Sequence, residues 1–181
     1  AWILNIRGSD GPNSPVPNSR LIVSKNKKIF LISKTQKIKK LIKERKIKFN
    51  EFIDNIDFPK KISQFKGDYF IIDDKTCSIY FEDIIKSKFK IVKKEDPVYL
   101  LKAIKNKTEI MNMINTHILD GVALTKFIYW IKNINKKQIN EVQAQKKLES
   151  FRKLNKNYLY PSFNTIAGSG KNGAIVHYRA N

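Results

Sequence analysis

Short apolar segments alternate with polar ones along the first half of the chain. Residues 2–7 have strand character, and the apolar runs Leu21–Val23 and Ile29–Ile32 predict an antiparallel hairpin, because the polar segment between them suits a turn. Turn-forming residues fill 8–18, which predicts a loop. Thr35–Phe49 carries apolar residues at helical spacing, so we expect a helix whose lysine face is solvated.

A strand–helix–strand unit follows in the pattern. Tyr69–Ile72 predicts a buried strand, Thr76–Lys86 a helix and Phe89–Val92 a further short strand. The next helix is expected to begin at Asp96-Pro97. Asp96 is a favourable cap, and Pro97 fits the first turn because its missing N–H has no helical partner there.

The second half has helical periodicity. Between residues 107 and 135 the spacing predicts one long amphipathic helix, or a pair broken near Asp120-Gly121. Gly121 on the buried stripe suggests close approach to another backbone, and we interpret His117 as a packed core histidine because no ligand partner lies four residues away. The stripe consists of Ile110, Ile114, His117, Gly121, Leu124, Ile128 and Ile131.

A further helix is expected from about Glu141 to Leu154. Asn140 is its predicted cap and Gln143 stands at the capping-box position. The residues expected to face inward are Val142, Leu148 and Phe151. The change from alternating short strands and helices to helical periodicity predicts a domain boundary near residues 93–96. We therefore expect an α+β chain with domains 1–96 and 97–181.

A glycine cluster at residues 168–173 matches G-x-G-x-x-G. A dinucleotide site would need a helix after the glycines, and a phosphate loop would need lysine where Ala174 stands. The short β-branched run 174–178 instead predicts a strand–loop–strand in which the glycines supply positive φ or close backbone approach. His177 would end a strand, where it could bond a substrate carbonyl, shuttle a proton or be structural, and the spacing alone favours the structural role.

The net charge is large, with 36 Lys+Arg against 16 Asp+Glu, a formal +20. However, 31 of these cations are lysines, whereas arginine is the residue of bidentate phosphate and base-edge recognition. Lysine, isoleucine and asparagine are the residues that A/T-rich codons encode. We therefore expect no dedicated nucleic-acid or membrane partner.

Few side chains are available for metal or nucleophile chemistry. Cys77 is the sole cysteine, which excludes an intrachain disulfide and a cysteine-based metal site and makes a reducing, cytoplasmic location the expectation. No apolar run approaches the roughly 18 residues of a spanning helix, and the first residues have no signal-peptide character. Because the first residue is Ala1 and not Met, we expect that the beginning is missing. The acidic pairs at 73–74 and 95–96 are interpreted as structural.

Four groups of motifs follow one another along essentially the whole chain: Ala1–Asp10 with Asn13–Val16; Ala103–Asn106, Glu109, Met113, His117, Asp120–Leu124, Phe127 and Trp130; Glu141, Leu148-Glu149 and Phe151-Arg152; and Ser162–Gly170 with Asn172–Tyr178. In their order and composition these motifs resemble long-form Xaa-Pro aminopeptidases (aminopeptidase P) of the creatinase-like superfamily. The resemblance implies part of a creatinase-type middle domain, with a mixed sheet and helices, followed by the first helices and strand of a pita-bread catalytic domain.

The resemblance also implies a chemistry. Family members are hydrolases that release an N-terminal residue preceding proline, using two metal ions, usually manganese, that activate a bridging water. Their partners are peptides with proline in second position, and they commonly form homodimers. His177 matches the histidine of the G-x-N-x-A-x-x-H-Y motif. This match implies a contact with the substrate that helps to stabilise charge during attack by the water.

In the family, the metal ligands are two aspartates, one histidine and two glutamates, and all five come after the H-Y motif in the sequence. We therefore expect no metal ligand and no bound metal in this chain. The sequence is therefore expected to be a fragment, lacking the N-terminal domain and the metal-binding part, and inactive alone. Two alternatives stay open. One is a lysine-rich, non-catalytic module on the same scaffold that binds nucleic acid or protein. The other is one half of a split enzyme whose second chain supplies the ligands.

The interpretation of the charge gives a first testable prediction. We expect weak binding of duplex DNA at physiological salt, because solvated lysines attract phosphate without a built site. Titration of labelled DNA at several salt concentrations measures this. A submicromolar affinity with a steep dependence on salt would favour the binding-module alternative.

Overall fold

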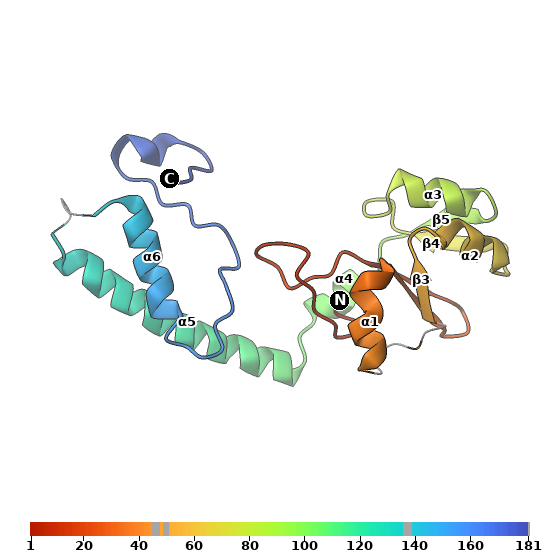
Figure 1. Ribbon diagram of the computed structural model, residues 1–181, viewed down its shortest axis with the longest axis horizontal. Helices are drawn as coiled ribbons and strands as arrows, with labels where there is room; N and C mark the ends of the chain where they lie inside the picture. Colours follow the sequence, from red (N-terminus) through yellow and green to blue (C-terminus); the bar gives the residue numbers. More distant parts are fainter. Residues whose placement is uncertain (45–47, 49–50, 136–138, 181) are drawn as a thin grey trace. The chain divides into compact units, whose positions relative to one another are not determined.

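The computed structural model describes residues 1–44, 48, 51–135 and 139–180, and it divides the chain into two compact units (Figure 1). The first unit contains residues 1–10 and 15–103, and the second contains 11–14 and 104–181. The helices of the first unit are α1 (Thr35–Lys43), α2 (Phe58–Gln64), α3 (Ile79–Lys86) and α4 (Val98–Ala103).

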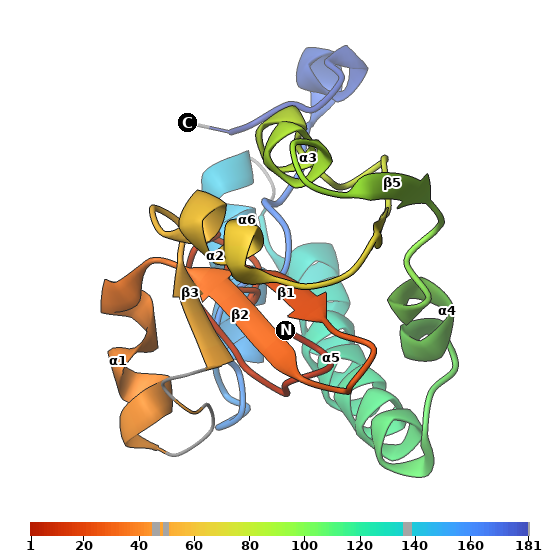
Figure 2. The same ribbon diagram turned by 90° about the vertical axis from the view of Figure 1, so that its right-hand side faces the viewer.

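A mixed three-stranded sheet organises the first unit (Figure 2). Its order is β1 (Arg20–Val23), β2 (Ile29–Ser33) and β3 (Phe52–Asp54). β1 and β2 are antiparallel, so the predicted hairpin is confirmed, whereas β2 and β3 are parallel and α1 lies between them in the chain.

Strand β2 is packed on both faces. Leu31 and Ile32 are consecutive, so their side chains leave opposite faces of the sheet. Leu31 clusters with Ile38 of α1, whereas Ile32 clusters with Phe58 of α2. The helical prediction for 35–49 is confirmed as far as Lys43, and residues 45–47 and 49–50 lie outside the described residues.

The N-terminus of α1 is capped from the neighbouring strand. The Thr35 N–H donates to Asp54 Oδ2 at 2.8 Å, and the Thr35 hydroxyl donates to the same oxygen. Hydrogen bonds from the Thr35 hydroxyl, the Ile56 N–H and the Thr35 N–H, in that order, lower the pKa of Asp54. β3 and α1 are thus joined by a carboxylate that no local sequence pattern indicates.

The predicted strand–helix–strand unit is confirmed as β4 (Tyr69–Ile72), α3 and β5 (Lys90–Lys93), with the two strands parallel. In β4, Tyr69 and Ile71 are exposed, whereas Phe70 is partly buried and Ile72 is buried. The prediction of a fully buried strand is therefore wrong: in this two-stranded sheet, alternate side chains of β4 face solvent.

One hydrophobic core joins both sheets of the first unit. It contains Ile32, Ile53, Phe58, Ile62, Ile72, Phe81, Ile85 and Phe89. At its centre the rings of Phe58 and Phe81 meet edge to face, with centroids 4.7 Å apart. This packing holds α2 and α3 together.

Residues 2–5 form turns and residues 6 and 7 are irregular, so the predicted strand is wrong. The Asn5 N–H donates to the Trp2 carbonyl at 3.1 Å, and the Ile6 N–H donates to the Ala1 carbonyl at 3.1 Å. Asn5 has a φ of 47°, in the left-handed region that asparagine tolerates. The reversal places Ile6 in the cluster around Leu31 instead of extending the sheet.

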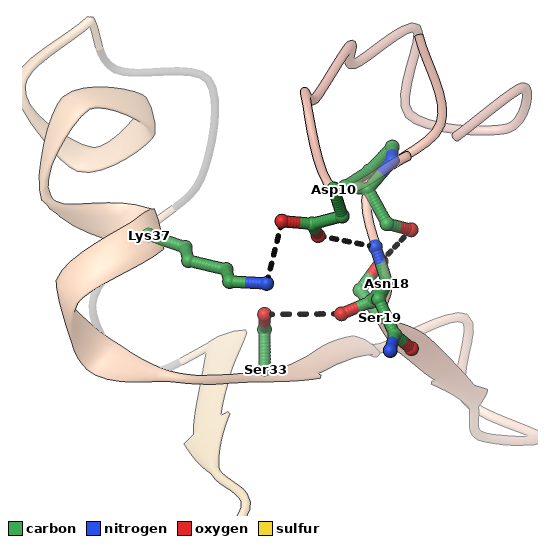
Figure 3. A network of polar contacts seen from close by, with 6 residues as sticks. Asp10, Asn18, Ser19, Ser33 and Lys37 are labelled. Atoms are coloured by element: carbon green, nitrogen blue, oxygen red, sulfur yellow. Dashed lines mark hydrogen bonds and ion pairs between the residues drawn. The ribbon is translucent and has the colours of Figure 1, made fainter. Parts of the chain in front are cut away.

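The turn-rich segment 8–18 is a loop, as predicted, and its Asp10 contacts Lys37 and Asn18, which belong to the first unit as Asp10 does (Figure 3). The Asp10 carboxylate accepts from Lys37 Nζ at 2.7 Å and from the Asn18 N–H at 2.6 Å. Hydrogen bonding to Lys37 is the main cause of the lowered pKa of Asp10. Gly8 is required here, because a Cβ would lie 2.7 Å from Pro17.

Two helices, each with a capping box at its N-terminus, dominate the second unit: α5 (Lys107–Asn133) and α6 (Glu141–Arg152). Of the two interpretations of 107–135, the continuous helix is confirmed. The capping box predicted for α6 is also confirmed, because Asn140 and Gln143 exchange side chain–backbone hydrogen bonds of 2.9 Å. No described helix is both long enough and apolar enough to cross a membrane.

The apolar stripe predicted on α5 does not form its packed face. Ile110 and Ile114 are exposed, His117 is exposed with Nδ1 2.8 Å from the Met113 carbonyl, and a Cβ on Gly121 would meet nothing within 4 Å. Ala123 is the buried residue instead. Apolar side chains occur all round α5, so periodicity could not single out the face that packs. The packed-histidine and close-backbone interpretations are therefore wrong.

The core of the first unit gives a stability prediction. Phe58→Ala is expected to lower the free energy of unfolding by about 3–5 kcal/mol, because the ring is 1% exposed and its removal leaves a cavity. Urea unfolding followed by far-UV circular dichroism measures the change. Ile56→Ala is the control, because Ile56 is 87% exposed. Equal losses in the two variants would contradict the assignment of the core.

Candidate functional site

The glycine segment is a chain of tight turns. Gly170–Ala174 form a 3₁₀ helix, and the described residues 174–178 contain no strand, so the strand–loop–strand prediction is wrong. The predicted roles of the glycines are seen at two positions. Gly170 has a φ of +54°, and a Cβ on Gly168 would lie 2.7 Å from the Asn172 carbonyl oxygen.

A carboxylate at the first residue of α6 holds this segment. Glu141 Oε2 accepts from the Tyr178 hydroxyl at 2.7 Å, and Asn172 Nδ2 lies 3.2 and 3.3 Å from the two carboxylate oxygens. The Ser169 N–H also donates to Glu141, and Asn172 Nδ2 donates to the Tyr178 hydroxyl oxygen at 3.0 Å. We call these four residues, Glu141, Ser169, Asn172 and Tyr178, the Glu141 network.

Hydrogen bonding shifts both acids of the Glu141 network. The Tyr178 hydroxyl, followed by the Ser169 N–H, lowers the pKa of Glu141 because each bond stabilises the carboxylate. The same hydroxyl contact raises the pKa of Tyr178, because a phenolate could not donate to Glu141. The position of Glu141 at the N-terminus of α6 also suits a negative charge.

His177 lies next to the anchored Tyr178. It does not end a strand as predicted: its φ is 55° and its side chain is exposed. The Tyr178 N–H donates to the Ile175 carbonyl at 3.3 Å, closing a turn around His177. The structure therefore holds the neighbouring tyrosine in place while the imidazole stays open to solvent.

An ion pair fastens α6 to α5. Arg152 Nε and Nη2 donate to the two Asp120 carboxylate oxygens at 2.6 and 3.1 Å. This contact is the main cause of the raised pKa of Arg152. Because both side chains remain partly exposed, the pair contributes mainly geometry rather than a large stabilisation.

The acidic pairs at 73–74 and 95–96 have structural contacts, in agreement with the interpretation from the sequence. Asp73 Oδ2 accepts from the Asp96 N–H at 2.9 Å, and Asp96 Oδ1 accepts from the Val98 N–H at 2.9 Å, close to the start of α4. The described residues bring together no group of three His, Cys, Asp or Glu side chains that could hold a metal ion. These residues therefore do not fit a divalent metal site of the kind that the resemblance implies.

The lowered pKa of Glu141 predicts acid sensitivity of the glycine segment. A carboxyl with a depressed pKa contributes stability above its ordinary value of 4.5 and loses it as the pH falls through the lowered pKa. We therefore expect the Ser169 amide to lose hydrogen-exchange protection over that acidic interval. The Ala144 amide, which bonds to the Asn140 carbonyl inside α6, is the control. Parallel loss at both amides would contradict a local role for Glu141.

Comparisons with known proteins agree with the fold. Residues 1–109 match the Creatinase/Prolidase N-terminal domain, and residues 111–181 match Metallopeptidase family M24. Xaa-Pro aminopeptidase ApepP of Drosophila melanogaster is 34% identical, with 98% of this chain and 30% of the relative covered. Probable Xaa-Pro aminopeptidase P of Paracoccidioides brasiliensis (strain Pb03) is 33% identical, with 99% and 32% covered.

Probable Xaa-Pro aminopeptidase P of Laccaria bicolor is likewise 33% identical, with 99% of this chain and 29% of the relative covered. The chain thus spans about 30% of the length of the Drosophila relative and a similar share of the two fungal ones. The match to the Creatinase/Prolidase N-terminal domain ends at residue 109, directly before the match to Metallopeptidase family M24 begins. The chain therefore belongs to the family defined by the Creatinase/Prolidase N-terminal domain, and its residues 111–181 are similar to Metallopeptidase family M24.

Proposed function

We propose that this chain is part of an Xaa-Pro aminopeptidase, which releases an N-terminal residue preceding proline, and that His177 contacts the peptide substrate. The match to relatives of that name across both domains supports the reaction. The observation that carries the role of His177 is its exposed position beside the anchored Tyr178.

The chemistry of the scissile bond suits an imidazole donor. Proline has no backbone N–H, so the peptide bond before it offers only its carbonyl oxygen for hydrogen bonding. A ring N–H of His177 can donate to that oxygen and stabilise the negative charge that develops there during attack. This role needs a histidine at the surface of the site, in a fixed position.

We further propose that this chain does not hydrolyse peptides by itself. The M24 family uses divalent metal ions, which we expect to be two manganese ions, and the described residues gather no set of three ligands for one. The metal-binding residues would then lie in another part of the polypeptide or, in a split enzyme, in a second chain. A cytoplasmic location, supported by the sole Cys77, and a homodimer remain predictions.

The proposed function is tested with the purified chain and an Xaa-Pro tripeptide. With Mn²⁺ present we expect no cleavage, whereas the ring signals of His177 in an NMR spectrum should shift as the peptide is added to above about 1 mM. His117, the other histidine, is an internal control because it lies on α5. Cleavage that a chelator abolishes would contradict the predicted inactivity. Equal shifts of both histidines, or none, would contradict the contact with His177.

A further inference from the structure

We propose that Glu141 is a positioning residue for His177: it fixes Tyr178, and through Tyr178 the left-handed backbone turn that presents the imidazole. The importance of His177 rests on the proposed function. The positioning itself rests on contacts within the second unit and can be tested separately.

The first step is the convergence of donors on one carboxylate. They come from the start, the middle and the end of the segment, namely Ser169, Asn172 and Tyr178. The Tyr178 hydroxyl both donates to Glu141 and accepts from Asn172. A tyrosine side chain has two rotatable bonds before its rigid ring, so fixing its hydroxyl leaves the backbone at residue 178 little freedom.

The second step is the conformation of His177. A φ of 55° is uncommon for a residue with a Cβ, and such a conformation persists where the surrounding structure determines it. The turn bond from the Tyr178 N–H to the Ile175 carbonyl is long, at 3.3 Å. The hydrogen bond from the Tyr178 hydroxyl to Glu141 is shorter, at 2.7 Å, and it holds Tyr178, the last residue of the turn.

The third step is the support of Glu141 itself. The capping of α6 is done by Asn140 and Gln143, so the Glu141 side chain is free of that task and its bonds go to the glycine segment. α6 is in turn fastened to α5 by Asp120 and Arg152. The exposed imidazole is thereby linked to the helical scaffold through the Glu141 carboxylate.

The test uses the full chain with uniform isotope labelling, so that the histidine and tyrosine rings and the backbone amides are all observed, and it compares Glu141→Gln with Glu149→Gln. Both changes remove one negative charge from α6, but Glu149 pairs with Lys153 at 2.9 Å instead of with the glycine segment. An amide offers one acceptor oxygen where the carboxylate offers two, so Glu141→Gln must lose part of the convergence. Tyr178→Phe is the second variant, because it removes the hydroxyl and keeps the ring.

In Glu141→Gln and Tyr178→Phe we expect the His177 ring signals to move or broaden and the amide of Ser169 or Asn172 to exchange several-fold faster. The Tyr178 pKa should fall toward its ordinary value of 10.0 in Glu141→Gln. The His117 signals and the far-UV circular dichroism should stay unchanged in all variants. His177 signals that match those of Glu149→Gln would overturn the proposal.

These outcomes separate the two proposals. If Glu141→Gln moves the His177 signals but an Xaa-Pro peptide does not, the positioning stands and the substrate contact fails. If the peptide moves them and both Glu141→Gln and Tyr178→Phe leave them unchanged, the substrate contact stands and the positioning fails.

Discussion

The contact between Glu141 and Tyr178 is the interaction on which the arrangement of the candidate site depends. Past α6, the described residues up to 180 form turns, a 3₁₀ helix and irregular backbone without a strand. A segment with no ladder of backbone bonds needs side-chain contacts to take one conformation, because each ordered residue loses conformational entropy. A carboxylate that receives three donors supplies such contacts, and it is itself held at the start of a capped helix.

Elements with a local signal were predictable from the sequence. The hairpin β1–β2, the unit β4–α3–β5 and the Asn140 capping box each follow from neighbouring residues, whose spacing or side-chain chemistry determines the backbone. Predictions failed where a particular turn, or a contact with a residue far away in the sequence, determines the backbone conformation. Asn5 reverses the chain at residues 2–7, and the β-branched Ile175 and Val176 remain exposed in turns although their side chains favour strands.

The candidate site could be predicted only in part for the same reason. The resemblance to a family identifies His177, and the structure shows it exposed, but its proposed role depends on contacts that leave no periodic pattern. Ser169, Asn172 and Tyr178 lie 28, 31 and 37 residues from Glu141. A usable signal was nevertheless present: an acidic residue directly after a helix cap, with polar residues in the glycine segment that could donate to it.

Three carboxylates fix local structure in a chain with a large excess of positive charge. The chain has 16 acidic residues against 36 lysines and arginines, so acidic side chains are the less numerous members of its possible ion pairs. Asp10 holds the loop 8–18, Asp54 caps α1, and Glu141 holds the glycine segment, and hydrogen bonds lower the pKa of all three. Each therefore contributes stability at neutral pH that is lost as the pH falls through its lowered pKa. The lysine excess makes the net charge of this chain large, but the organisation of both units depends on where its few carboxylates are placed.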